Sequence, residues 1–216
     1  SSVKETGFLL DSIQGYNSSN NYITNGLSGY SAFFSHYGGQ KVLMEATPEY
    51  LIQKEIPFKA FKEMDQLPKV LFVFRKPSER IYSAYKFHKY TTNRIPSELT
   101  FDDYLKNSKG MHMVEISYYF KHLQRWINFL GRDKVFVCLF EDLKSNPRKV
   151  LENISDWVGI DIAYWKDQSF DAKNQTQNIN NQLLHKLAIN VNQLVPRGLA
   201  ERIIKQIGRA HVWTPV

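Results

Sequence analysis

Residues 69–85 read KVLFVFRKPSERIYSAY and predict a strand, a turn and a helix in succession. The run 70–74 is apolar at both odd and even positions, which is typical of a strand covered on both faces in a parallel sheet. Charged residues follow at once, and Pro77 suits the first turn of a helix over residues 78–91. This unit indicates an α/β fold.

The rest of the chain continues the alternation of strands and helices. A second apolar run at 135–140 predicts another covered strand, and residues 41–44 predict a weaker third. Such alternation indicates a parallel sheet with crossover helices on both faces. Four further helices are predicted. One begins after the cap Thr100, with Asp102 and Asp103 in its first turn, and another runs from Asn146-Pro147 to about Val158. A third spans 116–130, with Tyr119, Leu123, Trp126 and Leu130 on one face, and a fourth covers 179–194.

Composition limits the kinds of partner. The net charge of +7 and the isoelectric point near 9.3 favour anionic ligands. Basic residues are scattered rather than gathered in runs, so we expect no nucleic-acid partner. The one cysteine, Cys138, lies in an apolar run typical of a core, and no histidine pair has metal-ligand spacing on a helix face, so we expect no metal. No window approaches roughly 18 uncharged apolar residues, so we expect no membrane span.

Arg75 ends the first predicted strand, at the edge where open α/β sheets bind ligands. Its planar guanidinium suits forked recognition of a phosphate. Ser83 follows within two helical turns and could place a hydroxyl near the same anion. The alternative is that Arg75 pairs with a surface carboxylate such as Glu79 while Ser83 is an ordinary helix residue. Spacing alone leaves both interpretations open.

The segment RKPSERIYSAY at 75–85 resembles the Arg-x-Pro-x-x-Arg-x-x-Ser-x-Tyr signature of sulfotransferases that use 3′-phosphoadenosine 5′-phosphosulfate (PAPS), particularly the heparan-sulfate type and its bacterial relatives. Other segments resemble family elements in the same order, so that the resemblance covers roughly residues 4–159. These segments are VKETGFL at 3–9, NGLSGY at 25–30, MEATPEYL at 44–51, SYYFKHLQRW at 117–126 and FEDLKSNP at 140–147.

The resemblance implies a P-loop-like parallel sheet and a donor site at its edge. Arg75 and Ser83 match the family residues that hold the 3′-phosphate of PAPS. Tyr119 would line the donor site by analogy, although its helical spacing also suits a core residue. The implied reaction moves a sulfuryl group to a hydroxyl without a metal.

The resemblance also implies an acceptor side. Glu5 matches the carboxylate that removes the proton of the acceptor hydroxyl, and we expect Lys4 and Glu45 to contact the substrate. The acceptor must carry a hydroxyl, and the resemblance to heparan-sulfate enzymes favours a saccharide such as a glycan. Ala46 departs from the pattern, because several heparan-type enzymes carry Lys there, and this weakens the expectation of a sulfated glycan.

Both ends of the chain suggest an incomplete domain. The family's first strand and its phosphate loop, a Lys-x-Gly-Thr-type sequence, are expected before Glu5 and are missing. The last residues, IGRAHVWTPV at 207–216, look like a translated sequencing adapter, so we interpret them as a non-native tail and not as the family's Gly-Arg-x-His loop. We expect a partial sulfotransferase domain over residues 1–206.

Two other functions remain open from the sequence. A P-loop nucleotide kinase would share the parallel sheet but would need magnesium and a Gly-rich loop upstream. A non-catalytic homologue would hold an anionic ligand through its basic surface and transfer nothing. We expect a cytoplasmic location, with the Golgi lumen as the alternative for a eukaryotic protein.

Overall fold

The structure is a computed structural model that describes residues 5–12 and 19–165, apart from the side chain of Tyr164. The chain divides into two compact units, and residues 86–98 belong to the second of them. The other described residues belong to the first unit, which carries both strands. The predicted helix at 179–194 lies outside the described residues.

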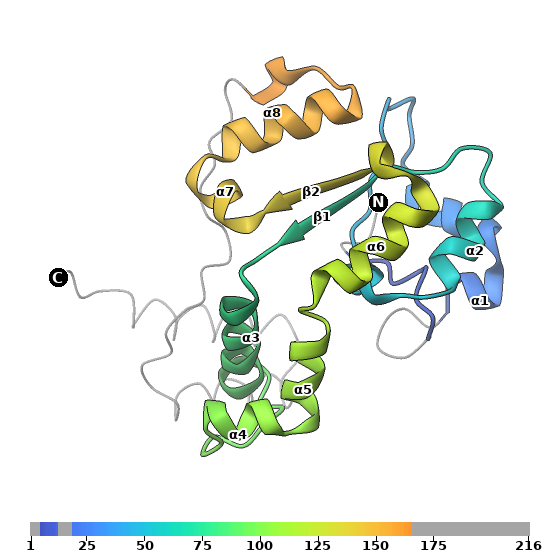
Figure 1. The fold of residues 1–216 in the computed structure, drawn as a ribbon. Coiled ribbons are helices and arrows are strands. Elements are labelled where there is room, and N and C mark those ends of the chain that lie inside the picture. The colour runs from blue at the N-terminus through green and yellow to red at the C-terminus, as the bar shows by residue number, and fades with distance from the viewer. Residues whose placement is uncertain (1–4, 13–18, 166–216) are drawn as a thin grey trace, which may run out of the picture. The chain divides into compact units, whose positions relative to one another are not determined.

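A two-stranded parallel sheet lies at the centre of the first unit (Figure 1). Strand β1 covers Val70–Phe74 and strand β2 covers Val135–Leu139. Their register pairs Val70 with Val135 and Phe74 with Leu139. The two continuous apolar runs therefore form strands as predicted, and the connection between them is helical, which confirms the α/β class. The expectation of a further strand and phosphate loop upstream stays a prediction.

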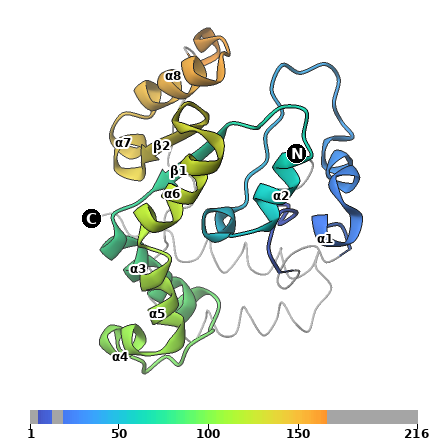
Figure 2. The same cartoon turned by 45° about the vertical axis from the view of Figure 1, so that its right-hand side comes forward.

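Helices α6 (Tyr119–Leu130) and α8 (Pro147–Val158) pack on opposite faces of the sheet (Figures 1 and 2). On one face the ring of Trp126 in α6 contacts Phe72 of β1 at a centroid distance of 5.4 Å. On the other face Trp157 of α8 contacts Phe136 of β2 at 5.2 Å. The prediction of helices on both faces is therefore confirmed.

Strand β1 is nevertheless covered on one face only, which corrects the prediction for this strand. Phe72 and Phe74 are buried, whereas Leu71 is 41% exposed and Val73 is 48% exposed. The reason is the placement of the cover, since α8 contacts the neighbouring strand through Phe136. Among the described residues, nothing buries the second face of β1.

Trp126 is the centre of the core that α6 forms with the sheet. It is 1% exposed, its ring lies 4.9 Å from Phe58, and its indole Nε1 donates a 3.0 Å hydrogen bond to the carbonyl of Leu51. The indole ring thus buries a large apolar surface while its N–H group keeps a hydrogen-bond acceptor, so its burial leaves no unpaired donor. The predicted apolar face of this helix is confirmed: Trp126 and Leu130 belong to the buried core, and the partly buried Tyr119 and Leu123 pack against it.

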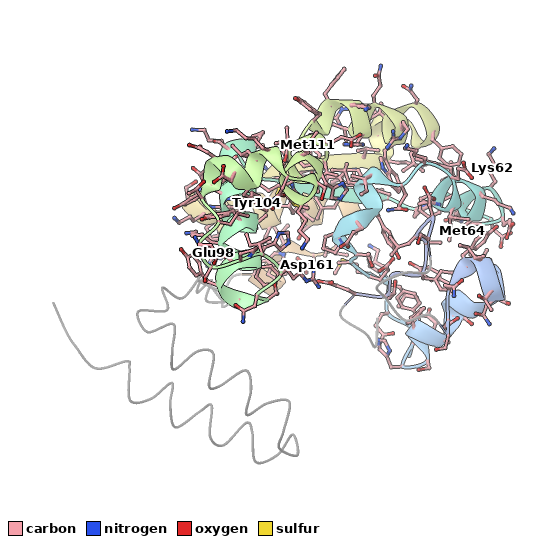
Figure 3. The ribbon with its side chains drawn as sticks, turned by 90° about the horizontal axis from the view of Figure 1, so that it is seen from below. Lys62, Met64, Glu98, Tyr104, Met111 and Asp161 are labelled. Carbon is pink, nitrogen blue, oxygen red and sulfur yellow. The ribbon has the colours of Figure 1, made fainter. Side chains whose placement is uncertain are left out.

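Local signals define most of the helical starts. Thr100 accepts a 3.1 Å hydrogen bond from the amide of Asp103 at the start of α4 (Phe101–Lys106), and Asn146 accepts one of 3.2 Å from Lys149 at the start of α8. Tyr104 of α4 is fully buried (Figure 3), and its ring lies 5.3 Å from that of Tyr85 in α3 (Pro77–Lys86). The remaining elements are α1 (Tyr22–Asn25), η1 (Leu27–Phe34), η2 (Pro48–Ile52), α2 (Ile56–Lys62), η3 (Phe87–Thr91, a π-helical turn), α5 (Ser108–Glu115), η4 (Arg132–Lys134), α7 (Phe140–Ser145) and η5 (Ile162–Trp165).

One predicted strand is wrong, and one predicted helix starts later than expected. Residues 41–44 form no strand, and the exposed Leu43 and Met44 bury no apolar surface that would favour one. The helix expected over 116–130 begins only at Tyr119, and the preceding residues end a separate helix, α5. There the Ser117 hydroxyl donates a hydrogen bond to the carbonyl of Met113 and accepts one from Arg80. These side-chain bonds hold the chain where the two helices are interrupted. In the described part of the chain, no helix is long and apolar enough to span a bilayer.

Candidate functional site

Arg75 follows β1 directly, as the sequence predicts, and its guanidinium is tied to Glu79. Nε and Nη2 donate to the Oε2 atom of Glu79 at 3.3 and 3.2 Å. The guanidinium also lies over the ring of Phe140, 5.4 Å from its centroid. The ion pair that the sequence left open as an alternative is therefore present. It is partly exposed to solvent, with 36% of the Arg75 and 50% of the Glu79 side-chain surface accessible.

The backbone around Arg75 is held from both sides. The hydroxyl of Tyr119 donates a 2.9 Å hydrogen bond to the Arg75 carbonyl, and the Tyr119 ring stacks on Phe74 at 4.3 Å. The amide of Lys76 donates to the Glu141 carboxylate at 3.0 Å, and this backbone hydrogen bond lowers the pKa of Glu141. Burial raises the pKa of Tyr119. Tyr119 thus packs against the core and also fixes the strand end.

Ser83 lies on α3 and is half-buried. It stands four residues after Glu79, so the two side chains share one side of the helix. Glu79 is the residue that contacts the Arg75 guanidinium. Joint contact of Arg75 and Ser83 with one anion stays a prediction.

The segment that follows Glu5 is tied to the loop that precedes η2. The buried hydroxyl of Thr6 donates to Glu45 Oε2 at 3.0 Å and lies 3.0 Å from the hydroxyl of Tyr50. The amide of Gly7 donates to the hydroxyl of Thr47 at 3.0 Å. Glu5 itself is half-buried at the head of this segment, and Lys4 lies outside the described residues.

Glu45 is the carboxylate on which these hydroxyls converge. Besides Thr6, it accepts hydrogen bonds from Tyr30 at 3.3 Å and from Thr47 at 3.4 Å. Burial raises the pKa of Tyr50 to about 12, and burial together with the nearby Glu45 charge raises the pKa of Tyr30 as well. We name Thr6, Tyr30, Glu45, Thr47 and Tyr50 the Glu45 cluster.

Asp11 holds the other end of the same segment. Its carboxylate accepts hydrogen bonds from the amides of Lys54, Glu55 and Ile56 at 2.7, 3.2 and 2.8 Å, at the start of α2. Its own amide donates to the Gln53 side chain at 2.7 Å. A carboxylate in this position satisfies amides that the helix itself leaves without partners. Residues 6–11 are therefore attached at both ends to residues 45–56.

Helix α6 contacts both the segment 45–56 and the backbone of Arg75. Tyr119, its first residue, bonds the Arg75 carbonyl, whereas Arg125 and Trp126 donate to the carbonyls of Ile52 and Leu51 at 3.1 and 3.0 Å. Seven residues of helix correspond to about 10 Å along the axis. One rigid element thus sets the spacing between the candidate donor residue and the loop that carries Glu45.

The sequence did not single out Asp11, Thr6, Tyr30 or Tyr50. The last three lie within the segments VKETGFL, NGLSGY and MEATPEYL, so the resemblance offered a signal at these positions. Asp11 carried none, because its partners lie more than 40 residues away. Among the described residues, no group of three His, Cys, Asp or Glu side chains is placed to hold a metal ion.

Comparison with known proteins agrees with this architecture. The family model of the sulfotransferase domain matches residues 9–211. Rat Sulfotransferase 1A1 is 25% identical over 125 residues, covering 56% of this chain and 42% of that protein. Human Heparan sulfate glucosamine 3-O-sulfotransferase 3B1 is 27% identical over 143 residues, covering 62% of this chain and 35% of that protein.

The fold has a solved counterpart in a sulfotransferase from Alicyclobacillus acidocaldarius. The two superpose with a TM-score of 0.62 at 20% sequence identity, over 94% of this chain and 83% of the other. The chain spans less than half the length of the curated relatives named above. Because the family model matches most of its residues, the chain belongs to the sulfotransferase-domain family.

Proposed function

We propose that this chain transfers a sulfuryl group from PAPS to an acceptor hydroxyl. The observation that carries the proposal is that one helix, α6, holds both a strand-end arginine and the loop bound to the Glu5 segment. Membership of the sulfotransferase-domain family supports the reaction class and sets the nucleotide kinase alternative aside. No metal takes part in the proposed reaction.

The donor side would be built on Arg75, with Ser83 and Tyr119. A phosphate fits this position because the guanidinium is half-exposed at a strand end and Lys76 adds a second positive charge next to it. Binding would replace Glu79 with the 3′-phosphate as the partner of Arg75. Tyr119 would act by holding the Arg75 backbone.

The acceptor side would be built on Glu5. Its carboxylate would take the proton of the acceptor hydroxyl as the oxygen attacks sulfur, and the adenosine bisphosphate would leave. PAPS supplies the activated sulfuryl group, while the protein supplies alignment and charge stabilisation. A saccharide is the favoured acceptor, since relatives include heparan sulfate enzymes. Contact of Lys4 with the acceptor, the domain boundaries, and the cytoplasmic or Golgi location stay predictions.

Nucleotide binding to the purified chain tests the donor side. Calorimetric titration with adenosine 3′,5′-bisphosphate should show binding that Arg75→Ala weakens by about 1.5–3 kcal/mol, the range for a charged hydrogen bond. Lys62→Ala, which removes an exposed positive charge on α2, is the matched control and should bind like the wild type. Equal affinity of all three proteins would overturn the donor assignment.

Transfer activity separates an enzyme from a non-catalytic homologue. Incubation with PAPS and a panel of hydroxyl-bearing saccharides should yield sulfated product, and Glu5→Gln should lose it while keeping nucleotide affinity. Binding that persists with no transfer to any acceptor class would favour the non-catalytic alternative.

A further inference from the structure

Glu45 is attached to the segment after Glu5 by a set of hydrogen bonds whose donors and acceptors follow from the chemistry of the groups. An ionised carboxylate only accepts hydrogen bonds, so the hydroxyls of Thr6, Tyr30 and Thr47 must all donate to it. Each hydroxyl carries one hydrogen. Once that hydrogen is given to Glu45, the hydroxyl can only accept from its other neighbours.

Two chains of hydrogen bonds therefore connect three backbone amides to one carboxylate oxygen, because the Phe8 amide also donates to the Thr6 hydroxyl, at 3.2 Å. In the first, the Leu9 amide donates to Tyr50 at 3.3 Å, Tyr50 donates to Thr6 at 3.0 Å, and Thr6 donates to Glu45 Oε2 at 3.0 Å. In the second, the Gly7 amide donates to Thr47 at 3.0 Å, and Thr47 donates to the same Oε2 atom at 3.4 Å. Consecutive hydrogen bonds of this kind polarise and strengthen one another.

We infer that Glu45 is a positioning residue, which holds the segment directly after Glu5 against the loop before η2, rather than a residue that binds the acceptor. The role of Glu5 in this inference rests on the proposed function, whereas the hydrogen bonds of Glu45 do not depend on it. Both carboxylate oxygens already accept hydrogen bonds from the protein. Glu45 thus orders residues 6–9, and their order places the preceding carboxylate.

The two amide-to-Glu45 chains end on Oε2, whereas Tyr30 bonds Oε1. Because of this asymmetry, a neutral glutamine at position 45 can test whether Glu45 acts by holding the hydroxyls or through its negative charge. In Glu45→Gln the amide oxygen can take the place of Oε2 and keep both chains, while the NH2 group donates to Tyr30, whose hydroxyl can rotate. In Glu45→Ala both chains lose their final acceptor.

Positioning therefore predicts unequal effects of the two substitutions. Glu45→Ala should lower kcat by roughly 100-fold, the cost of misplacing a catalytic group by about 1 Å. Glu45→Gln should stay within about threefold of the wild type, since it keeps the acceptor of both chains. A substrate-binding or charge role predicts instead that Glu45→Gln loses as much as Glu45→Ala, with the loss in KM, and that result would overturn the inference.

Hydrogen exchange gives a readout that does not depend on activity. Glu45→Ala should speed exchange of the Gly7 and Leu9 amides by roughly tenfold or more, because the Thr47 and Tyr50 hydroxyls that accept from them are no longer anchored through Glu45. Glu45→Gln should leave exchange unchanged. The matched control is Glu49→Ala, which removes an exposed carboxylate in the adjoining η2 and should also leave these amides protected.

Thr6→Val keeps the test decisive if Glu45→Ala fails to fold. This near-isosteric change removes the acceptor of the Phe8 amide and the anchor of the Tyr50 hydroxyl, to which Leu9 donates. Phe8 and Leu9 should therefore exchange faster, while Gly7 keeps its protection through Thr47. Unchanged protection of Leu9 in Thr6→Val would refute the connected chains. The exchange experiment needs no nucleotide or acceptor, so its outcome is independent of the nucleotide titration that tests the proposed function.

Discussion

Removal of the Glu79 charge tests whether Arg75 is the group that receives the nucleotide phosphate. In Glu79→Gln the guanidinium loses its ionic partner, which now contacts it at 3.2 and 3.3 Å. The pair is spaced i, i+4 and partly exposed, so it stabilises the chain by only about 0.3–0.5 kcal/mol. A phosphate that binds Arg75 must displace Glu79, so the substitution should tighten binding of adenosine 3′,5′-bisphosphate about twofold.

The double variant Arg75→Ala/Glu79→Gln makes this reasoning specific. If Glu79 acts by competing for the guanidinium, its removal should have no effect on nucleotide affinity once Arg75 is gone. Glu115→Gln, which breaks an exposed 3.7 Å pair with Lys121, is the matched control and should bind like the wild type. Calorimetry on the four proteins and the control measures the coupling. A gain from Glu79→Gln that persists without Arg75 would refute competition at this site.

Two further predictions concern the groups that support the site. Tyr119→Phe should lower the free energy of unfolding by about 0.5–1.5 kcal/mol through loss of its bond to the Arg75 carbonyl, measured by urea denaturation, and an unchanged midpoint would contradict the role of that hydroxyl. The pKa of Tyr50 is raised to about 12, so the folded chain favours the neutral phenol. The stability that this shift contributes is fully present below the unfolded pKa of about 10, and it is lost as the pH rises toward 12. Tyr50→Phe should flatten the alkaline decline between about pH 10 and 12, and an identical slope in both proteins would show that Tyr50 does not titrate there.

Local chemistry in the sequence predicts the elements whose partners are near in the chain. The runs at 70–74 and 135–140 are strands because their residues are apolar at successive positions, and the caps Thr100 and Asn146 act on amides three residues later. The position of Arg75 follows in the same way from the end of the first run. The resemblance in segment order then indicates the family without a structure.

The prediction fails where a partner is distant or lacking. Residues 41–44 have a strand-like composition, but among the described residues they pair with no strand, and Leu43 and Met44 stay exposed. The pairing of Arg75 with Glu79 was one of two interpretations that spacing allowed, and only side-chain geometry selected it. Leu71 and Val73 look like residues covered on both sides, and their exposure depends on where α8 packs.

The sequence alone determined the two apolar strands and the capped helices, because each depends on residues within a few positions of one another. The order of strands, helices and motifs along the chain indicated the α/β class and the family. Only the tertiary structure decided that Thr6, Glu45 and Tyr50 share one hydrogen-bonded cluster, that Asp11 caps a helix 45 residues away, and that α6 holds both halves of the site. Contacts at such separations depend on the path of the chain through space, which no local pattern of residues specifies.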